Sequence, residues 1–153
     1  YQRPAQSKPV AIAVEHPELI SAEYKRMNEE LHENRLDYGI SGSKYADVVF
    51  KLCQNMKTTA VLDYGCGKGY LAKALPFPIW EYDPAVPSKS ELPRPADLVI
   101  CTDVLEHVEP EKLLYVLADL RRVTRKVGYF VVHLGPAKKQ LPDGRNSHLI
   151  QKS

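Results

Sequence analysis

Glycines recur at every second position directly after a short apolar run that ends in an aspartate. The run ends at Asp63, and the glycines follow at Gly65, Gly67 and Gly69. Glycine has no Cβ and adopts positive φ at little cost, so such a loop lets the backbone approach a bound ligand closely. The segment is therefore a candidate cofactor-binding loop.

The spacing of these glycines disfavours two common classes of ligand. The dinucleotide fingerprint places its third glycine at position 70, where Tyr70 stands. The P-loop of many nucleoside triphosphatases requires Lys and then Ser or Thr after its last glycine, and Lys68 is instead followed by Gly69. Both a nicotinamide dinucleotide and a phosphate loop of this kind are thus disfavoured.

Two carboxylates accompany the loop where strands of a parallel sheet would end. Asp63 lies two residues before the first glycine, where its carboxylate can face an ammonium group of a ligand directly or through water. Asp83 follows the next apolar run, where a carboxylate can accept hydrogen bonds from both hydroxyls of a ribose. The alternative for both acids is a local role as a loop or helix cap.

A third polar group follows the next apolar run and consists of Asp103, Glu106 and His107. Histidine is the side chain best suited to accept a proton near neutral pH, so His107 is a candidate general base with Glu106 beside it. Capping of the following helix is the alternative for these two residues. We interpret His133, which lies in a later apolar run, as a buried core histidine.

The period of the apolar residues predicts the elements that position these groups. Helical spacing predicts helices over 21–34 (with Ser21 as N-cap), 43–56, 71–75 and 110–124. Short apolar runs predict strands over 60–63, 79–82, 96–101 and 129–134. Alternating strands and helices predict an α/β fold with a doubly wound, mostly parallel sheet, whose ligand lies beyond the carboxyl ends of the strands.

Two further expectations concern the second half of this pattern. The proline-rich stretch 84–95 is short for a full strand and helix, so we expect a loop or a vestigial strand around 90–92. The helix over 110–124 is expected to bury one set of apolar residues, namely Leu113, Leu114, Leu117, Leu120 and Val123.

Composition excludes several classes of protein. The 153 residues are 44% hydrophobic, which suits one globular domain, and no apolar run approaches the roughly 18 residues needed to span a membrane. The N-terminal stretch lacks the apolar segment of a secretory signal, so we expect a cytoplasmic protein. Cysteine occurs three times, at Cys53, Cys66 and Cys101, which disfavours a disulfide framework and favours reduced thiols.

In the order and spacing of its motifs the sequence resembles the class I S-adenosylmethionine-dependent methyltransferases. The matching segments are 61–69, 81–84 and 96–108, and the likeness covers about 58–135. The resemblance implies a Rossmann-like domain that binds S-adenosylmethionine, with Asp83 on the ribose. It assigns the other cofactor contacts to Asp63, Tyr64, Gly65, Cys66, Gly67 and Gly69 after the first strand and to Thr102, Asp103 and Val104 after the third.

A related branch, the small-RNA 2′-O-methyltransferases, holds a divalent metal with Glu-x-x-Glu-His after this strand and a later histidine. Here Asp103-x-x-Glu106-His107 and the downstream His148 look similar, which makes His148 a third catalytic candidate. Carboxylate and imidazole ligands suit Mn²⁺, Co²⁺ or Zn²⁺ better than Mg²⁺. The first acid is Asp instead of Glu, and many methyltransferases carry Leu-Glu-His here without metal. No metal is therefore assigned, and the alternative stays open.

The resemblance implies methyl transfer to a small-molecule or nucleotide-like acceptor, with a non-catalytic cofactor-binding module as the alternative. Residues 111–153 carry 9 Lys and Arg against 3 Asp and Glu, which favours an anionic substrate or simply a solvated helix face and basic tail. Aromatic and basic residues do not interleave as on a nucleic-acid platform, and the net charge is only +2. The sequence contains no signature of an oligomeric state.

We expect an extended arm over 1–20 and a single domain over 21–153. Within the domain, N-terminal helices occupy 21–57, the Rossmann-like core 58–135 and a C-terminal loop 136–153. The pattern lacks the last helix and two strands that usually complete this sheet, and the chain begins with Tyr1. We therefore expect a shortened fold, from either a fragment or a minimal version of the domain.

Overall fold

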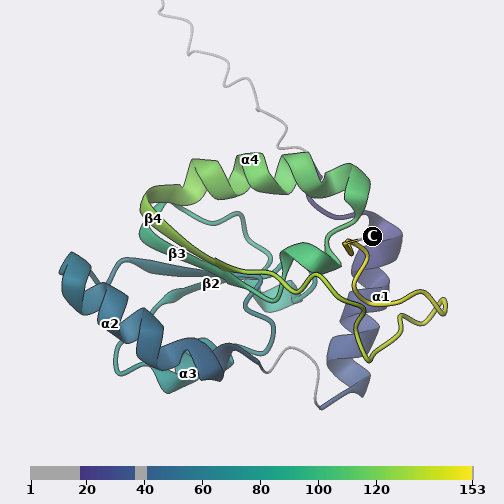
Figure 1. The fold of residues 1–153 in the computed structure, drawn as a ribbon, viewed down its shortest axis with the longest axis horizontal. Coiled ribbons are helices and arrows are strands. Elements are labelled where there is room, and N and C mark those ends of the chain that lie inside the picture. The colour runs from purple at the N-terminus through teal and green to yellow at the C-terminus, as the bar shows by residue number, and fades with distance from the viewer. Residues whose placement is uncertain (1–17, 37–40, 153) are drawn as a thin grey trace, which may run out of the picture.

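The computed structural model describes residues 18–36 and 41–152, which form a central sheet with helices on both faces (Figure 1). Its four parallel strands have the order β2-β1-β3-β4, with bounds β1 Val61–Tyr64, β2 Trp80–Tyr82, β3 Ala96–Thr102 and β4 Thr124–Val131. Helix α4 (Leu113–Val123) covers one face, and α2 (Ala46–Met56) and α3 (Tyr70–Ala74) cover the other. The predicted doubly wound parallel fold is thus confirmed in a shortened form.

Helix α1 (Ala22–Asn34) lies across the end of the sheet toward which the strands run (Figure 1). Ser21 is its N-cap, as predicted, because the Ser21 hydroxyl accepts a hydrogen bond of 3.2 Å from the Tyr24 amide. Four short 3-10 helices complete the described elements: η1 Ser41–Tyr45, η2 Pro87–Lys89, η3 Leu105–His107 and η4 Pro110–Lys112. Most of the arm expected over 1–20 lies outside the described residues.

The core has two layers because β1 and β3 are buried on both faces. Successive side chains of a strand point to opposite faces, so Leu62 and Val99 pack toward α4, whereas Leu98 and Ile100 pack toward α2 and α3. All four side chains are inaccessible to solvent. Each such burial stabilises the fold by about 1.5–3 kcal/mol, so this pair of strands fixes the loops that follow it.

The predicted start of the last strand is wrong, because β4 begins at Thr124 and ends at Val131. The chain passes from α4 into the strand without a loop, and Thr124 pairs directly with Ala96 of β3. Within the described residues β4 pairs only with β3 and is an edge strand, so it tolerates the exposed Arg125 and Lys126. Because these charged residues interrupt the apolar run, the sequence pattern did not predict the first part of β4.

The buried face of α4 also differs from the expectation. Leu120 and Val123 are buried as predicted, but Leu114 is 77% exposed and Leu117 is 42% exposed. Two other residues form the buried face with them, Val116 and Asp119. The Asp119 carboxylate is satisfied there by a hydrogen bond of 2.9 Å from the Tyr64 hydroxyl, so a charged residue occupies a core position that apolar periodicity could not reveal.

Other expectations hold among the described residues. The stretch 84–95 is a loop interrupted only by η2, without the vestigial strand. All three cysteines are buried free thiols. Among the described helices, none combines the length and the apolar character needed to cross a membrane.

Two substitutions on α4 test the corrected burial. Leu120→Ala removes a side chain that is 3% exposed and should lower the free energy of unfolding by about 2–5 kcal/mol. Leu114→Ala, on the outer face, should change it by less than about 0.5 kcal/mol. Urea denaturation monitored by circular dichroism measures both values, and equal losses would contradict the observed orientation of α4.

Candidate functional site

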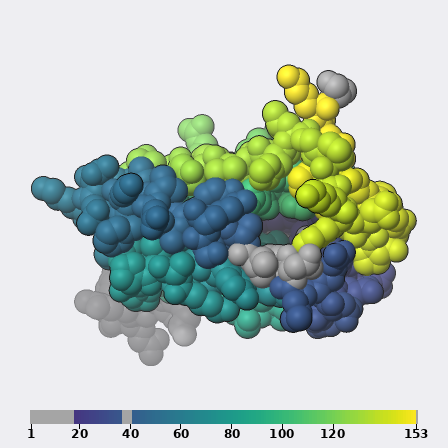
Figure 2. Space-filling view, turned by 60° about the horizontal axis from the view of Figure 1, so that its bottom comes forward, coloured from purple at the N-terminus to yellow at the C-terminus, as the bar shows by residue number. Residues whose placement is uncertain are grey.

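A cavity of about 630 Å³ opens beyond the carboxyl ends of the strands, as expected for this fold. The volume lies within the range of small-molecule sites, roughly 300–1,000 Å³. Figure 2 shows the hollow between the N-terminal segment that contains α1 and the C-terminal segment. The loops after all four strands contribute to its wall, through residues such as Gly65, Asp83, Val104 and His133.

Most of the predicted site residues line this cavity. They are Tyr64, Gly65, Gly67, Asp83, Asp103, Val104, Glu106, His107 and His148. The others are not part of the wall: Asp63 and Thr102 belong to β1 and β3, and Cys66 and Gly69 lie in the loop between β1 and α3. Their roles as cofactor contacts remain predictions, as do those of the residues on the wall.

All three glycines of the loop have left-handed backbone conformations, with φ of 80° at Gly65, 51° at Gly67 and 74° at Gly69. L-residues rarely adopt such values. A Cβ on Gly65 would also overlap the side chain of Val104, and a Cβ on Gly69 would overlap Glu81. At these two positions the conformation and packing of the protein itself therefore require glycine.

Asp83 fastens the glycine loop to the end of β2. One carboxylate oxygen accepts a hydrogen bond of 2.9 Å from the Gly67 amide, and the other accepts one of 2.9 Å from the Ala85 amide. A carboxylate oxygen has two lone pairs, so each retains capacity for a further donor. The fixed carboxylate can consequently accept two neighbouring hydroxyls, as the predicted contact with a ribose requires.

Asp63 precedes the glycine loop at the end of β1 and is buried, with the negative charges of Glu81 and Asp83 acting on it. Burial raises the pKa of its carboxyl group to about 7, and the negative charges of Glu81 and Asp83 act in the same direction. A cation bound nearby would favour its ionised form. This agrees with the predicted partnership with an ammonium group, although Asp63 is not on the cavity surface.

Asp103 has a strained backbone and a heavily bonded side chain. Its φ is 57°, a left-handed value that is uncommon for a residue other than glycine. The carboxylate accepts hydrogen bonds of 3.0 Å from both Lys44 and Tyr45, and the His133 ring nitrogen Nε2 lies 3.0 Å from it. Burial raises the pKa of Asp103, but hydrogen bonds from Lys44, Ser41 and Tyr45 outweigh this effect and hold the pKa below its usual value.

Glu106 and two histidines, His107 and His148, form a cluster in the cavity wall close to Asp103. Glu106 is completely buried, and its Oε1 accepts a hydrogen bond of 3.1 Å from the His133 amide. No described residue donates a hydrogen bond to Oε2. The rings of His107 and His148 meet edge to face, with centroids 4.8 Å apart. The structure thus brings together the three residues that were predicted to be catalytic.

Backbone carbonyls determine which nitrogen of each histidine carries the proton. Nδ1 of His107 lies 2.6 Å from the Ser147 carbonyl, and Nδ1 of His148 lies 2.7 Å from the Gly135 carbonyl. A carbonyl only accepts, so each Nδ1 is the donor, and in a neutral ring Nε2 is then the acceptor. Burial, which is the main influence, lowers the pKa of His107 and keeps its ring neutral.

This cluster also fits a divalent metal ion. Candidate ligand atoms of Glu106, His107 and His148 lie within 4.8 Å of one another. A carbonyl-bound Nδ1–H is the usual second contact of a metal-binding histidine. Asp103, Glu106 and His133 form a second group within the same distance, but Asp103 and His133 already pair with each other there. The first group is therefore the better candidate.

The basic C-terminal portion contributes two lysines, Lys138 and Lys139, to the cavity wall. Arg145 instead pairs with Asp143, with 2.7 Å between Nε and Oδ2. The excess of positive charge thus reaches the cavity in part, which suits an acceptor with anionic character.

Two sets of cavity residues were missed or misjudged from sequence. The interpretation of His133 as a core residue is wrong, because β4 ends at Val131 and the His133 side chain is 55% exposed. Helix α1 contributes Tyr24, Asn28 and His32, which were not predicted. Their four-residue spacing indicates that they share one face of a helix, but it does not indicate what that face contacts.

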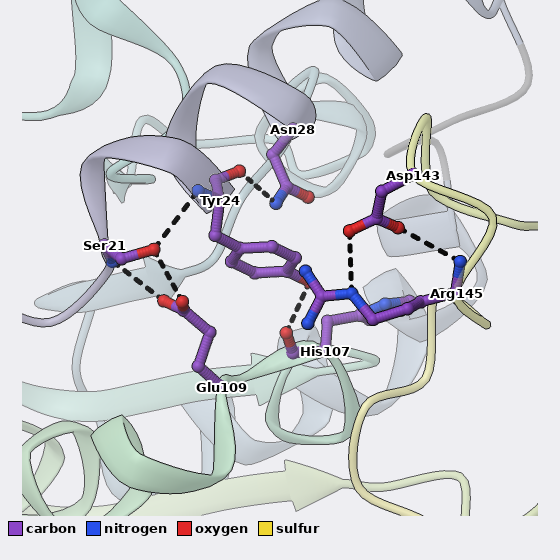
Figure 3. A network of polar contacts seen from close by, with 7 residues as sticks. All are labelled: Ser21, Tyr24, Asn28, His107, Glu109, Asp143 and Arg145. Carbon is purple, nitrogen blue, oxygen red and sulfur yellow. Dashed lines mark hydrogen bonds and ion pairs between the residues drawn. The ribbon is translucent and has the colours of Figure 1, made fainter.

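A polar network fastens the start of α1 to the loop after β3 (Figure 3). The Ser21 amide and hydroxyl donate hydrogen bonds of 2.8 and 2.6 Å to the two carboxylate oxygens of Glu109. The Tyr24 hydroxyl donates to the His107 carbonyl, and the Asn28 amide group donates to the Tyr24 carbonyl at 2.9 Å. Helix α1 and the Glu106–His107 segment are therefore positioned together.

The raised pKa of Asp63 predicts a pH dependence of stability. The folded protein holds this proton up to about pH 7, whereas an unfolded Asp releases it near 3.8, so stability should fall as pH rises through this window. One such group contributes at most about 1.4 kcal/mol per pH unit. Asp63→Asn should flatten the profile measured by urea denaturation from pH 4 to 7, and an unchanged slope would contradict the assignment.

Comparison with known families identifies the domain to which this site belongs. A family model described as a methyltransferase domain matches residues 18–145, which is most of the chain. Comparisons with curated proteins and with solved structures gave no match. The matched range includes the parallel sheet, the glycine loop and helix α1. The chain therefore belongs to the methyltransferase domain family, and the predicted membership of the class I S-adenosylmethionine-dependent methyltransferases is confirmed.

Proposed function

We propose that the protein binds S-adenosylmethionine over the glycine loop and transfers its methyl group to a small-molecule or nucleotide-like acceptor beside Glu106. The family supports methyl transfer in general. The observation that carries the finer proposal is that one cavity joins the glycine loop to a buried carboxylate oxygen of Glu106, which has no donor among the described residues and lies beside His107 and His148. Such an arrangement is suited to receive an acceptor that presents a proton or a positive charge.

The cofactor is proposed to lie along the cavity wall from Asp83 toward Glu106. Asp83 has lone pairs available for the two ribose hydroxyls, and the backbone of Gly65 and Gly67 in the cavity wall is proposed to lie against the methionine moiety. The sulfonium would then point toward the Glu106 cluster. The cavity wall would hold the acceptor and the methyl group in line for reaction.

The proposed reaction is an in-line displacement at the methyl carbon. A bond forms between an oxygen or nitrogen of the acceptor and the methyl carbon while the sulfur–carbon bond breaks, and the sulfonium becomes a neutral thioether. The acceptor's proton passes to Nε2 of His107 or His148, because each Nδ1 faces a backbone carbonyl and Nε2 is then the acceptor of the neutral ring. The adjacent Glu106 carboxylate would stabilise the resulting imidazolium.

A divalent cation is a second candidate for what this cluster binds. The observation that favours it is the gathering of three acceptor atoms, from Glu106, His107 and His148. This mixed carboxylate and imidazole set suits Mn²⁺, Co²⁺ or Zn²⁺. When bound, such an ion would lower the pKa of an acceptor hydroxyl.

Binding and turnover separate the candidate functions. Calorimetry should show binding of S-adenosylmethionine and S-adenosylhomocysteine but not of NAD, and transfer of a labelled methyl group should follow with at least one member of a panel of hydroxyl and amine acceptors. Glu106→Gln should lower kcat by at least about 100-fold and leave the Kd for S-adenosylhomocysteine within about twofold. The matched control is Glu111→Gln, an exposed acid in the same loop region.

Other outcomes would revise the proposal. Tight binding of NAD alone would overturn it. Cofactor binding without transfer to any acceptor would favour the non-catalytic module, and full activity of the Glu106→Gln variant would remove Glu106 from the mechanism.

Metal analysis tests the second candidate separately. If a cation is held, the purified protein should contain or take up one Mn²⁺, Co²⁺ or Zn²⁺ ion, and Glu106→Gln should abolish its uptake. Absence of any bound ion, together with activity that a chelator does not change, would contradict the metal and leave the proton-transfer version in place.

A further inference from the structure

Helix α1 presents one polar face to the cavity. Residues four apart share a face of a helix, and Tyr24, Asn28 and His32 all line the cavity wall. The neighbouring Met27 and Leu31 pack, together with Tyr24, in an apolar cluster with Leu141 of the C-terminal segment. With a rise of 1.5 Å per residue, the polar face extends for about 12 Å along the cavity.

A hydrogen bond near each end of α1 joins the helix to a different part of the proposed site. At the start of the helix, the Tyr24 hydroxyl donates to the carbonyl of His107, within the acceptor cluster (Figure 3). At the other end, the Lys68 ammonium group in the glycine loop donates to the Arg35 carbonyl, just after α1. These two contacts fix the start of α1 to the His107 segment and the end of α1 to the glycine loop.

His32 lies at the glycine-loop end of this face. Both His32 and Asp83, the carboxylate expected to hold the ribose, line the same cavity. Burial, the largest influence, lowers the pKa of His32, so its ring is neutral near pH 7. A neutral imidazole offers one donor, one acceptor and a flat apolar surface.

We propose that His32 is a specificity-determining residue of the cofactor site, contacting the adenosine part of the cofactor from the side opposite Asp83. The inference rests on the proposed cofactor site and adds a second wall to it. The order His32, Asn28, Tyr24 along the helix follows the order of nucleoside, sulfonium and acceptor along the cavity. The flat apolar surface of the imidazole ring can pack against a nucleobase, and its nitrogens can donate and accept hydrogen bonds with the base or the sugar.

Adenosine alone is the probe that tests this contact. In calorimetry, His32→Ala should raise the Kd values for adenosine and for S-adenosylhomocysteine by a similar factor of about 10, and His32→Gln should recover part of the loss. Glu33→Ala, at an exposed position of the same helix, should change neither value. In the wild-type protein, the ¹⁵N signals of the His32 ring should shift when adenosine is added, which a purely structural role would not produce.

Two results would overturn the inference. Binding of adenosine within twofold of wild type by both His32 variants, with an unchanged His32 ring spectrum, would show that the residue does not touch the nucleoside. In that case wild-type binding of S-adenosylhomocysteine would still support the proposed function. If the wild-type protein bound neither adenosine nor S-adenosylhomocysteine, the proposed function and this inference would fail together.

Discussion

The burial of Glu106 in η3, shortly after β3, is the constraint around which this part of the cavity is built. A buried carboxylate is costly unless donors surround it, and only one of its oxygens has a donor among the described residues. The same residue holds two later segments, because Glu106 accepts hydrogen bonds from the His133 amide through its side chain and from the Ile150 amide through its carbonyl. Displacing Glu106 would therefore also release the wall that His148 completes.

Three carboxylates in one cavity have three different surroundings. Asp83 is held by backbone amides, Asp103 by Lys44, Tyr45 and His133, and Glu106 by a single amide. Backbone donors orient Asp83 without neutralising it, which suits binding of uncharged hydroxyls. Asp103 is bound by the Lys44 ammonium group, the Tyr45 hydroxyl and the His133 ring. Glu106 differs from both other acids, because one of its oxygens has no donor among the described residues.

The features that were predictable from sequence are those that depend on local chemistry or on burial of both faces of a strand. Positive φ at Gly65, Gly67 and Gly69 follows from the turn itself, and β1 and β3 are mostly apolar, with one acid each, because helices cover both of their faces. The edge strand β4 and the core position of Asp119 depend on partners distant in sequence. Hydropathy could not reveal either.

The residues of the candidate site also divide into those that were predictable from the sequence and those that were not. The motif residues that follow β1, β2 and β3 were predictable because the ends of parallel strands converge. The roles of His133 and His32 were not, since one depends on where β4 ends and the other on the placement of α1 across the cavity. Contacts between Asp103 and the segment at Lys44 likewise join residues nearly sixty positions apart.

A crystal structure of the protein with S-adenosylhomocysteine would test the central claim most directly. The proposed site predicts both ribose hydroxyls on the Asp83 carboxylate and a sulfur atom that faces the cluster of Glu106, His107 and His148. A ligand bound elsewhere, or one whose sulfur points away from Glu106, would contradict the assignment of this cavity to methyl transfer.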